Sequence, residues 1–133
     1  MRKPSRAIAI GAAVAGALAL SPATPAFASV YSCVDAGEWG PGCYANVTAI
    51  NSGSYLAWHN QPNYSGGEVT NSLHFHNGDA MFLGCWTWGS GDADGHGDHY
   101  WFWTTIGSAG GYINDWYVTT GAYSNWSRYI GHC

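Results

Sequence analysis

The sequence predicts an all-β domain, and three observations support that prediction. After residue 28, short runs of β-branched and aromatic residues alternate with clusters of Gly, Asn, Ser and Pro, as they do in small domains of strands and tight turns. In the same part of the chain, no segment of ten or more residues repeats apolar residues at helical spacing. Its four cysteines are typical of a small exported domain that is held together by disulfides.

Six strands are expected along the chain, and several of them end at a recognisable turn. The clearest turns are Asn77-Gly78, which favours a tight hairpin loop, and the glycine-rich run 107–111. Residues 115–118 fit either a single 3₁₀-like turn or a last strand. The expected strands cover residues 44–50, 55–59, 68–75, 80–88, 99–106 and 112–114.

The first 28 residues have the composition of a secretory signal peptide. A short basic start is followed by the apolar run 7–20, and small residues at Ala26 and Ala28 permit cleavage before Ser29. The apolar run is shorter than the ~20 residues that a membrane-spanning helix needs. We therefore expect a secreted protein with no stable membrane insertion after cleavage.

Loss of this leader changes the charge of the chain. Arg128 is then the one Lys or Arg left against eight carboxylates, which gives a net charge of −7 with His neutral. A chain with so few cations lacks the contacts that bind phosphate, so we expect no nucleic-acid partner. Attachment to an anionic surface by charge is disfavoured for the same reason. The 105 residues from Ser29 onward suit one domain with one core.

Four cysteines allow three disulfide pairings. We expect Cys33–Cys43, which closes a short local loop, and Cys85–Cys133, which ties the last residue to the middle of the chain. On the chain-entropy model these bridges stabilise the fold by roughly 3 and 4 kcal/mol. No Cys-x-x-Cys is present, so a redox motif or a zinc knuckle is not indicated.

Two blocks of the chain carry a recognisable pattern. The first block, "LAWHNQPNY", precedes a Leu, an "NGD" turn and an apolar strand. The second and more specific block is "WTTIGSAGGYINDWYV". Together they resemble the bacterial SH3-like (SH3b) domain, in particular the small secreted type of high-GC Gram-positive bacteria. The first block departs from the family pattern at Trp58, His59 and Gln61. The matching positions are Leu56, Pro62, Tyr64, Leu73, Gly78, Cys85, Trp103, Ile106, Gly111, Tyr112, Ile113, Tyr117 and Val118.

The resemblance covers roughly residues 45–121 and implies a small SH3-like, partly open β-barrel of five to six antiparallel strands. On this layout, residues 1–28 are the signal peptide and residues 29–44 are an N-terminal extension with a local disulfide. Residues 122–133 form a C-terminal tail that Cys133 tethers.

The acidic run "GDADGHGDH" (91–99) is the strongest candidate for chemistry. Asp92, Asp94 and Asp98 fall at positions 1, 3 and 7 of a calcium loop, but Trp103 stands where the twelfth position requires Glu. No helix flanks the run, so an EF-hand is excluded. We interpret the run as a solvated hairpin loop in which Gly and Asp supply turn geometry, and we expect no metal and no cofactor.

Histidines offer a second, looser metal hypothesis. His74 and His76 share a face if they lie on one strand, and His96 and His99 lie in the acidic loop. These residues form a zinc or copper site only if the two segments meet, because such a site needs three or four ligands on a rigid frame.

Catalytic motifs are not indicated. The chain has no Gly-x-Ser-x-Gly, its cysteines are expected to be paired, and Glu38 and Glu68 lie in separate segments. A domain of this size also offers little room for a deep active-site pocket. We therefore do not expect an enzyme.

The aromatic residues point instead to recognition. A barrel this small cannot bury all eight Trp, so some line an exposed groove or pack under the N-terminal segment and the tail. The family pattern makes Trp103 a core residue. We predict a secreted binding module for a cell-wall peptide or another extracellular peptide, with a secreted inhibitor or interaction protein and a metal-binding protein as alternatives. The predicted ligand-binding residues are Trp58, His59, Tyr64, Trp86, Trp88, Trp101 and Trp116.

Overall fold

The computed structural model describes residues 32–35, 41–92 and 94–133 of the 133-residue chain. The predicted signal peptide (1–28) lies outside the described residues. Within them the chain is built mainly of strands with little helix, which confirms the all-β class. None of the helices in this part has the length and apolar character needed to span a membrane.

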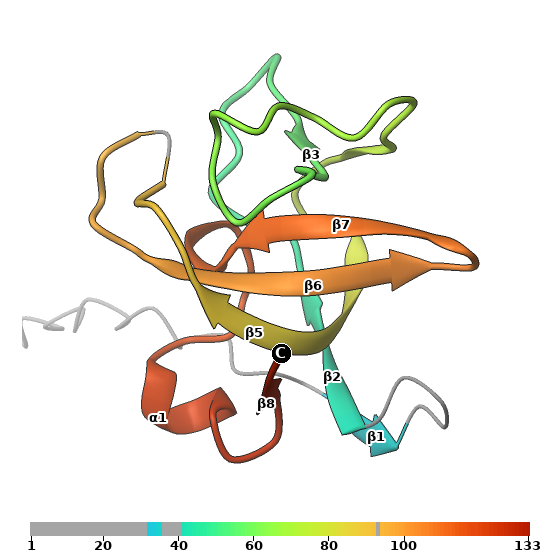
Figure 1. Ribbon diagram of the computed structural model, residues 1–133, viewed down its shortest axis with the longest axis vertical. Coiled ribbons are helices and arrows are strands. Elements are labelled where there is room, and N and C mark those ends of the chain that lie inside the picture. Colours follow the sequence, from blue (N-terminus) through green and yellow to red (C-terminus); the bar gives the residue numbers. More distant parts are fainter. Residues whose placement is uncertain (1–31, 36–40, 93) are drawn as a thin grey trace, which may run out of the picture.

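Most strands belong to one sheet in the order β1-β2-β5-β6-β7, in which every neighbouring pair is antiparallel (Figure 1). A separate two-stranded sheet pairs β3 with β4. The strands are β1 (Ser32–Asp35), β2 (Pro41–Asn46), β3 (Leu56–Ala57), β4 (His74–Phe75), β5 (Ala80–Trp88), β6 (Tyr100–Ile106), β7 (Ala109–Asn114) and β8 (Gly131–His132).

The long strand β5 has different neighbours along its length. Its first half pairs with β2, and its second half pairs in parallel with β8, so the expectation of antiparallel strands alone is wrong at this edge. The register to β6 shifts between Leu83 and Cys85, which is the irregularity that a β-bulge introduces. Bulges bend the strand that contains them, and β5 is visibly curved in Figure 1.

Both expected disulfides are present. Cys33 and Cys43 are direct register partners on β1 and β2. Cys85 and Cys133 join β5 to the chain end, which confirms that the tail is tethered. The tail forms the short helix α1 (Tyr123–Trp126) and then β8, neither of which the sequence predicted.

The sequence predicted some strands better than others. The bounds of β5 agree with the prediction, and β6 begins one residue later than expected. The predicted strand 68–75 is wrong over most of its length, because Asn71 has a positive φ of 58° and the amide of Ser72 closes a turn onto the carbonyl of Val69. Only β4 remains of it.

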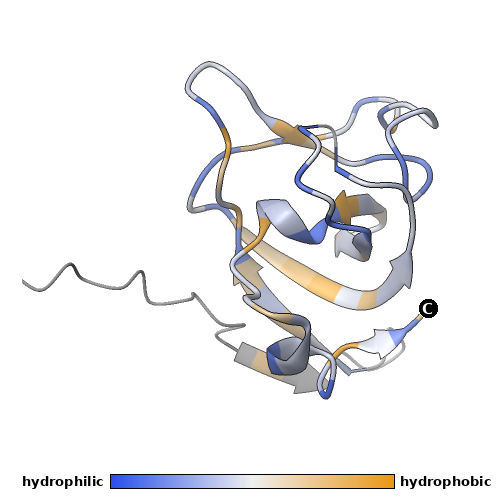
Figure 2. Cartoon of the chain, turned by 90° about the vertical axis from the view of Figure 1, so that its left-hand side faces the viewer, coloured by the Kyte–Doolittle hydropathy of each residue, from blue (hydrophilic) through white to orange (hydrophobic). Residues whose placement is uncertain are grey.

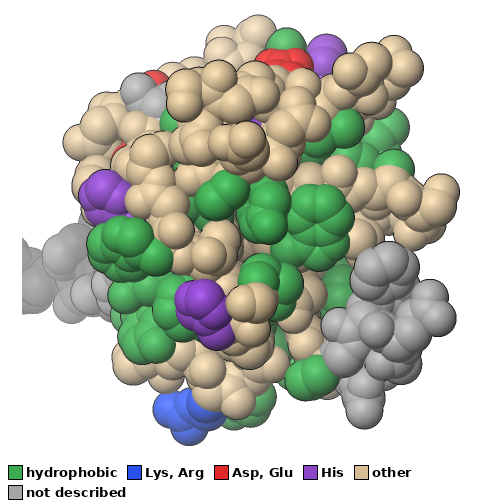
Figure 3. Space-filling model, viewed as in Figure 1, with side chains coloured by type: hydrophobic (Ala, Val, Ile, Leu, Met, Phe, Trp, Pro, Cys, Tyr) green, Lys and Arg blue, Asp and Glu red, His purple; other side chains and the backbone are tan. Residues whose placement is uncertain are grey.

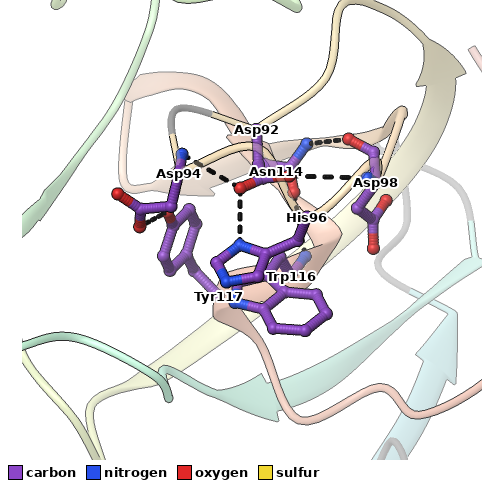
Figure 4. Close-up of polar contacts among 7 residues, drawn as sticks. All are labelled: Asp92, Asp94, His96, Asp98, Asn114, Trp116 and Tyr117. Atoms are coloured by element: carbon purple, nitrogen blue, oxygen red, sulfur yellow. Dashed lines mark hydrogen bonds and ion pairs between the residues drawn. The ribbon is translucent and has the colours of Figure 1, made fainter.

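The segment after β7 is a 3₁₀ helix, η2 (Asp115–Tyr117), so the turn was the correct alternative there. The side chain of Asn114 accepts a hydrogen bond from the amide of Trp116 at 3.0 Å and thereby caps η2. The last two residues of η2, Trp116 and Tyr117, point to different sides of this turn (Figure 4).

The core lies between the main sheet and the small sheet. Trp58 is at its centre, where the indole Nε1–H donates to Thr104 and the ring packs against Phe75. A Cβ on Gly111 would lie 2.5 Å from the Cβ of Trp58, so this approach requires glycine. His59 then pairs with Tyr112 of β7 and joins the two sheets. Figure 2 shows the hydrophobic colour concentrated on strands and the hydrophilic colour on the loops.

Candidate functional site

The seven predicted ligand-binding residues do not form one site. Two of them are wrong as ligand contacts, because Trp58 is 1% exposed and Trp101 is 0% exposed. The other five separate into a pocket, a packed aromatic cluster and an open groove. The sequence does not indicate that these aromatic side chains have such different surroundings.

The register between β5 and β6 explains this separation. Trp86 lies opposite Phe102, whereas Trp101 lies opposite Thr87, so Trp86 and Trp101 project from opposite faces of the strand pair. Loop 59–67 covers the Trp101 face, where the rings of Tyr64 and His59 lie 4.9 and 5.9 Å from the Trp101 ring. The expected groove between this loop and the Trp-rich strands is therefore closed.

Trp103 follows Trp101 on this face. It was expected in the core, but it is only partly buried and packs edge-to-face on Tyr112 with ring centroids 5.0 Å apart. The core residue of β6 is instead Phe102, which is fully buried beneath Trp126.

Trp86 packs under the C-terminal tail, as the alternative interpretation of the aromatics expected. Its ring contacts Tyr123, Trp126 and His132, with centroids between 4.5 and 5.8 Å away. These contacts bury part of the Trp86 ring against the tail. Trp86 therefore packs against the core and is not an open ligand contact.

His59 and Tyr64 line a pocket of about 290 Å³ that does not include the Trp-rich strands. Its floor is apolar and includes Ile50, Leu56 and Ala57. The rim is formed by the segment before β3, the loop that follows β3 and the acidic loop. No local sequence pattern indicates the other polar residues of the lining, because the fold brings them together from distant positions. They are Asn51, Ser54, Tyr55, Glu68, Asp94 and Tyr117.

The polar groups of this pocket are mainly hydrogen-bond acceptors and hydroxyls. Tyr55 donates to Glu68 Oε1 at 3.3 Å, and Tyr117 donates to Asp94 Oδ2 at 2.5 Å. Burial and the bond to Asp94 raise the pKa of Tyr117, so its hydroxyl stays protonated. Nδ1 of His59 is buried without a hydrogen-bond partner among the described residues, and burial lowers the pKa of this imidazole, so it is neutral at pH 7.

The acidic loop 91–99 folds around the carboxylate of Asp92 (Figure 4). This carboxylate accepts the amides of Asp94 and Asp98 at 3.1 and 3.4 Å, and His96 Nδ1 at 2.7 Å. Burial raises its pKa, but the hydrogen bonds from His96 and the two amides outweigh burial and hold the pKa below its usual value. The loop is therefore hydrogen-bonded and ordered at its centre, and the description of it as solvated is wrong for Asp92.

Ligand atoms of Asp92, Asp94 and His96 lie within 4.8 Å of one another and could meet a cation. Each of these groups also has a protein partner, since His96 bonds Asp92 and Tyr117 bonds Asp94. The other histidine pair does not join them: His74 stacks on Tyr55. In the part of the chain that the structure describes, this trio is the one cluster of metal-ligating side chains.

Trp88 and Trp116 line an open groove of similar volume, about 290 Å³, on another part of the surface. Their exposed fractions are 60% and 40%, the values expected for ligand contacts rather than core residues. Figure 3 shows hydrophobic and histidine side chains next to one another at the left of this face, near the end of β5 and the start of β6.

The chain was compared with protein-family models, curated proteins and solved structures. No significant match was found in any of the three comparisons.

Proposed function

We propose that this protein is a secreted, non-enzymatic binding module for an extracellular peptide, such as a cell-wall peptide, and that His59 and Tyr64 contact the ligand. The observation that supports the proposal is the 290 Å³ pocket that these two residues line. Ligand pockets combine apolar walls with a few polar groups, and this one has an apolar floor under an aromatic and acidic rim. Two disulfides keep the surrounding domain rigid, which reduces the entropy lost on binding.

The same residues favour a peptide with a cationic side chain. Glu68 and Asp94 supply carboxylates, while Tyr55, Tyr64 and Tyr117 supply ring faces. Cations are attracted both to carboxylates and to the negative faces of aromatic rings. No Lys or Arg lines the pocket to compete, because Arg128 lies elsewhere. A Lys-like side chain would insert its apolar stem over Leu56 and leave its ammonium group at the rim.

An SH3-like barrel is the fold that we propose for this module. The bridge from His59 to Tyr112 joins the small sheet to β7, and the bridge from Val47 to Val118 joins the start of the domain to its last turn. These two closures bring the loop with Tyr64 against the main sheet, as the partly open barrel requires. Export follows from the leader-like start of the sequence and is compatible with the two disulfides.

The experiment is a titration of the oxidised protein with a fluorescent tetrapeptide that contains one Lys, and with the same peptide after acetylation of that Lys. We expect the unmodified peptide to bind at least about tenfold more tightly, which corresponds to ~1.4 kcal/mol. Glu68→Gln should weaken only the unmodified peptide, because the substitution removes the charge and keeps the shape. Leu73→Ala, an exposed change outside the pocket, is the control.

Sedimentation with purified cell wall separates this function from its main alternative. A binding module for wall peptide should sediment with the wall, and Glu68→Gln should sediment less. An inhibitor or interaction protein should remain in the supernatant and form a complex with a secreted protein instead. If neither the peptide nor the wall binds the protein, the proposed peptide-binding function is wrong.

A further inference from the structure

The groove between Trp88 and Trp116 is a second surface with the properties of a binding site. It is separate from the peptide pocket, because the two sets of lining residues have no member in common. Trp88 comes from the end of β5 and Trp116 from η2, with Tyr123 of α1 between the two elements in the lining. Three large exposed aromatic side chains thus share one open groove.

Each tryptophan is held in place by a stacked histidine. The ring of His96 lies parallel to Trp116 at 3.8 Å, and the ring of His99 lies parallel to Trp88 at 5.0 Å. Both histidines are themselves fixed at Nδ1, since His96 bonds the buried carboxylate of Asp92 and His99 bonds the carbonyl of Gly89 at 2.9 Å.

The stacked histidines leave part of each indole surface exposed. One histidine covers one face of each indole, and the large exposed fraction shows that much of the remaining surface is open to a ligand. Exposed aromatic side chains that are oriented before binding lose less entropy when a ligand arrives. The fold therefore presents two flat, preoriented aromatic platforms.

Two carboxyl groups are among the polar groups that line the groove. Asp98 is half-buried and lines the groove, and its Oδ1 accepts the amide of Tyr100 at 3.0 Å. Asp115 lies deeper, and its carboxyl oxygen accepts the hydroxyl of Thr120. No Lys or Arg is among the lining residues. A ligand for this groove must therefore bring flat apolar faces and hydrogen-bond donors.

We propose that this groove binds a neutral oligosaccharide of β-gluco configuration, with sugar rings stacked on Trp88 and Trp116 and hydroxyl groups donating to Asp98. A pyranose whose substituents are all equatorial presents only axial C–H bonds on its two faces. These weakly positive hydrogens are attracted to the negative face of an aromatic ring. Its hydroxyls lie around the edge of the ring, where they can reach a carboxylate between two stacked sugars.

A cationic ligand fits the groove less well than it fits the peptide pocket. Burial raises the pKa of Asp115 to about 7 and also raises the pKa of Asp98, so near neutral pH the groove holds less negative charge than its two carboxyl groups suggest. A protonated carboxyl group can still exchange hydrogen bonds with a hydroxyl, whereas it offers no charge to an ammonium group.

The test is isothermal titration calorimetry of the oxidised full domain with cellohexaose and fully N-acetylated chitohexaose, both of which are neutral. Maltohexaose, which has the same number of glucose units as cellohexaose in a curved α-linked chain, is the matched negative control. Hexalysine is the cationic probe. We expect Trp88→Ala and Trp116→Ala each to weaken cellohexaose at least about tenfold. Tyr129→Ala removes an equally exposed aromatic side chain outside the groove and should change the affinity less than about twofold.

Thermal melting of each variant shows whether it is folded. If an Ala variant unfolds, Trp88→Phe and Trp116→Phe replace it, since a smaller ring should keep the packing and still weaken binding severalfold. The proposal is overturned if neither β-linked hexasaccharide binds at millimolar concentration, or if both Trp variants bind like the parent. It is also overturned if maltohexaose binds as tightly as cellohexaose, or if hexalysine binds and loses its affinity in Trp88→Ala. None of these outcomes bears on the Lys-peptide titration, which probes the other pocket.

Discussion

Asp115 should make the protein less stable as the pH rises from about 4 to about 7. Its carboxyl group is buried, and burial raises its pKa from the usual 3.8 to about 7, although the hydrogen bond from Thr120 acts in the opposite direction. Below pH 3.8 the folded and unfolded chains both hold this proton. Between the two values the unfolded chain releases the proton and the folded chain keeps it, so the free energy of unfolding falls with pH.

The structure sets the size of this effect. A rise from 3.8 to about 7, at 1.36 kcal/mol per pH unit, makes ionised Asp115 cost at most about 4 kcal/mol above pH 7. Asp115→Asn cannot ionise, and its amide oxygen can still accept the Thr120 hydroxyl. Imperfectly paired amide hydrogens should cost the variant ~1–2 kcal/mol at every pH. We therefore expect the variant to be no more stable than the parent at pH 3.5. At pH 8 its free energy of unfolding should exceed that of the parent by at least about 2 kcal/mol.

Urea unfolding of the oxidised protein between pH 3.5 and 8.5 measures this difference. Asp98 also has a raised pKa, so a smaller slope should remain in the variant. Glu68→Gln, which removes the same charge from an exposed side chain, is the control for net charge. Parallel stability curves for the parent and Asp115→Asn would refute the reasoning, because they would mean that Asp115 ionises alike in the folded and unfolded chains.

Three further outcomes are expected. Trp101→Ala should lower the free energy of unfolding by ~3–5 kcal/mol in urea melts, whereas Trp103→Ala, which removes a partly buried ring, should cost clearly less; equal costs would contradict the placement of Trp101 under loop 59–67. Peptide mapping should find both bridges and no free thiol in the described region, and loss of Cys85–Cys133 should cost up to about 4 kcal/mol on the chain-entropy model, more than loss of the shorter loop. EDTA should shift the melting temperature by less than about one degree, because a loop that hydrogen bonds hold draws no folding energy from an ion; a larger loss, with metal found by elemental analysis, would assign the Asp92 cluster to a cation.

The sequence predicts the strands whose stability depends on local pattern. β5 and β6 are long, rich in aromatic and β-branched residues, and bounded by turn residues. Their boundaries can therefore be predicted from the sequence to within one residue. The strand 68–75 has similar composition but forms a turn at Asn71, and the side-chain oxygen of Ser72 accepts a hydrogen bond from the backbone amide of Trp58. That contact joins residues 14 positions apart and has no local signature.

The absence of a local signature for long-range contacts also explains the errors at the candidate sites. Period-two alternation identified correctly that Trp101 and Trp103 share one face and that Phe102 lies on the other. It contains no information about which face a distant segment covers. Loop 59–67 covers Trp101, and the tail covers Trp86, while Trp88 is left exposed at the end of the same strand as Trp86. Burial here depends on tertiary contacts of the loop and the tail.

The acidic loop contributes residues to both candidate sites. Asp94 lines the peptide pocket, and His96 and Asp98 line the groove, although these residues are separated by only a few positions. Asp92 connects them, because its one carboxylate accepts the amides of Asp94 and Asp98 and the imidazole of His96. Glycines at positions 95 and 97 have positive φ angles of 77° and 78°, which lets the chain turn around this carboxylate. The Asp, Gly and His residues of this run thus place neighbouring side chains in the linings of two separate candidate sites.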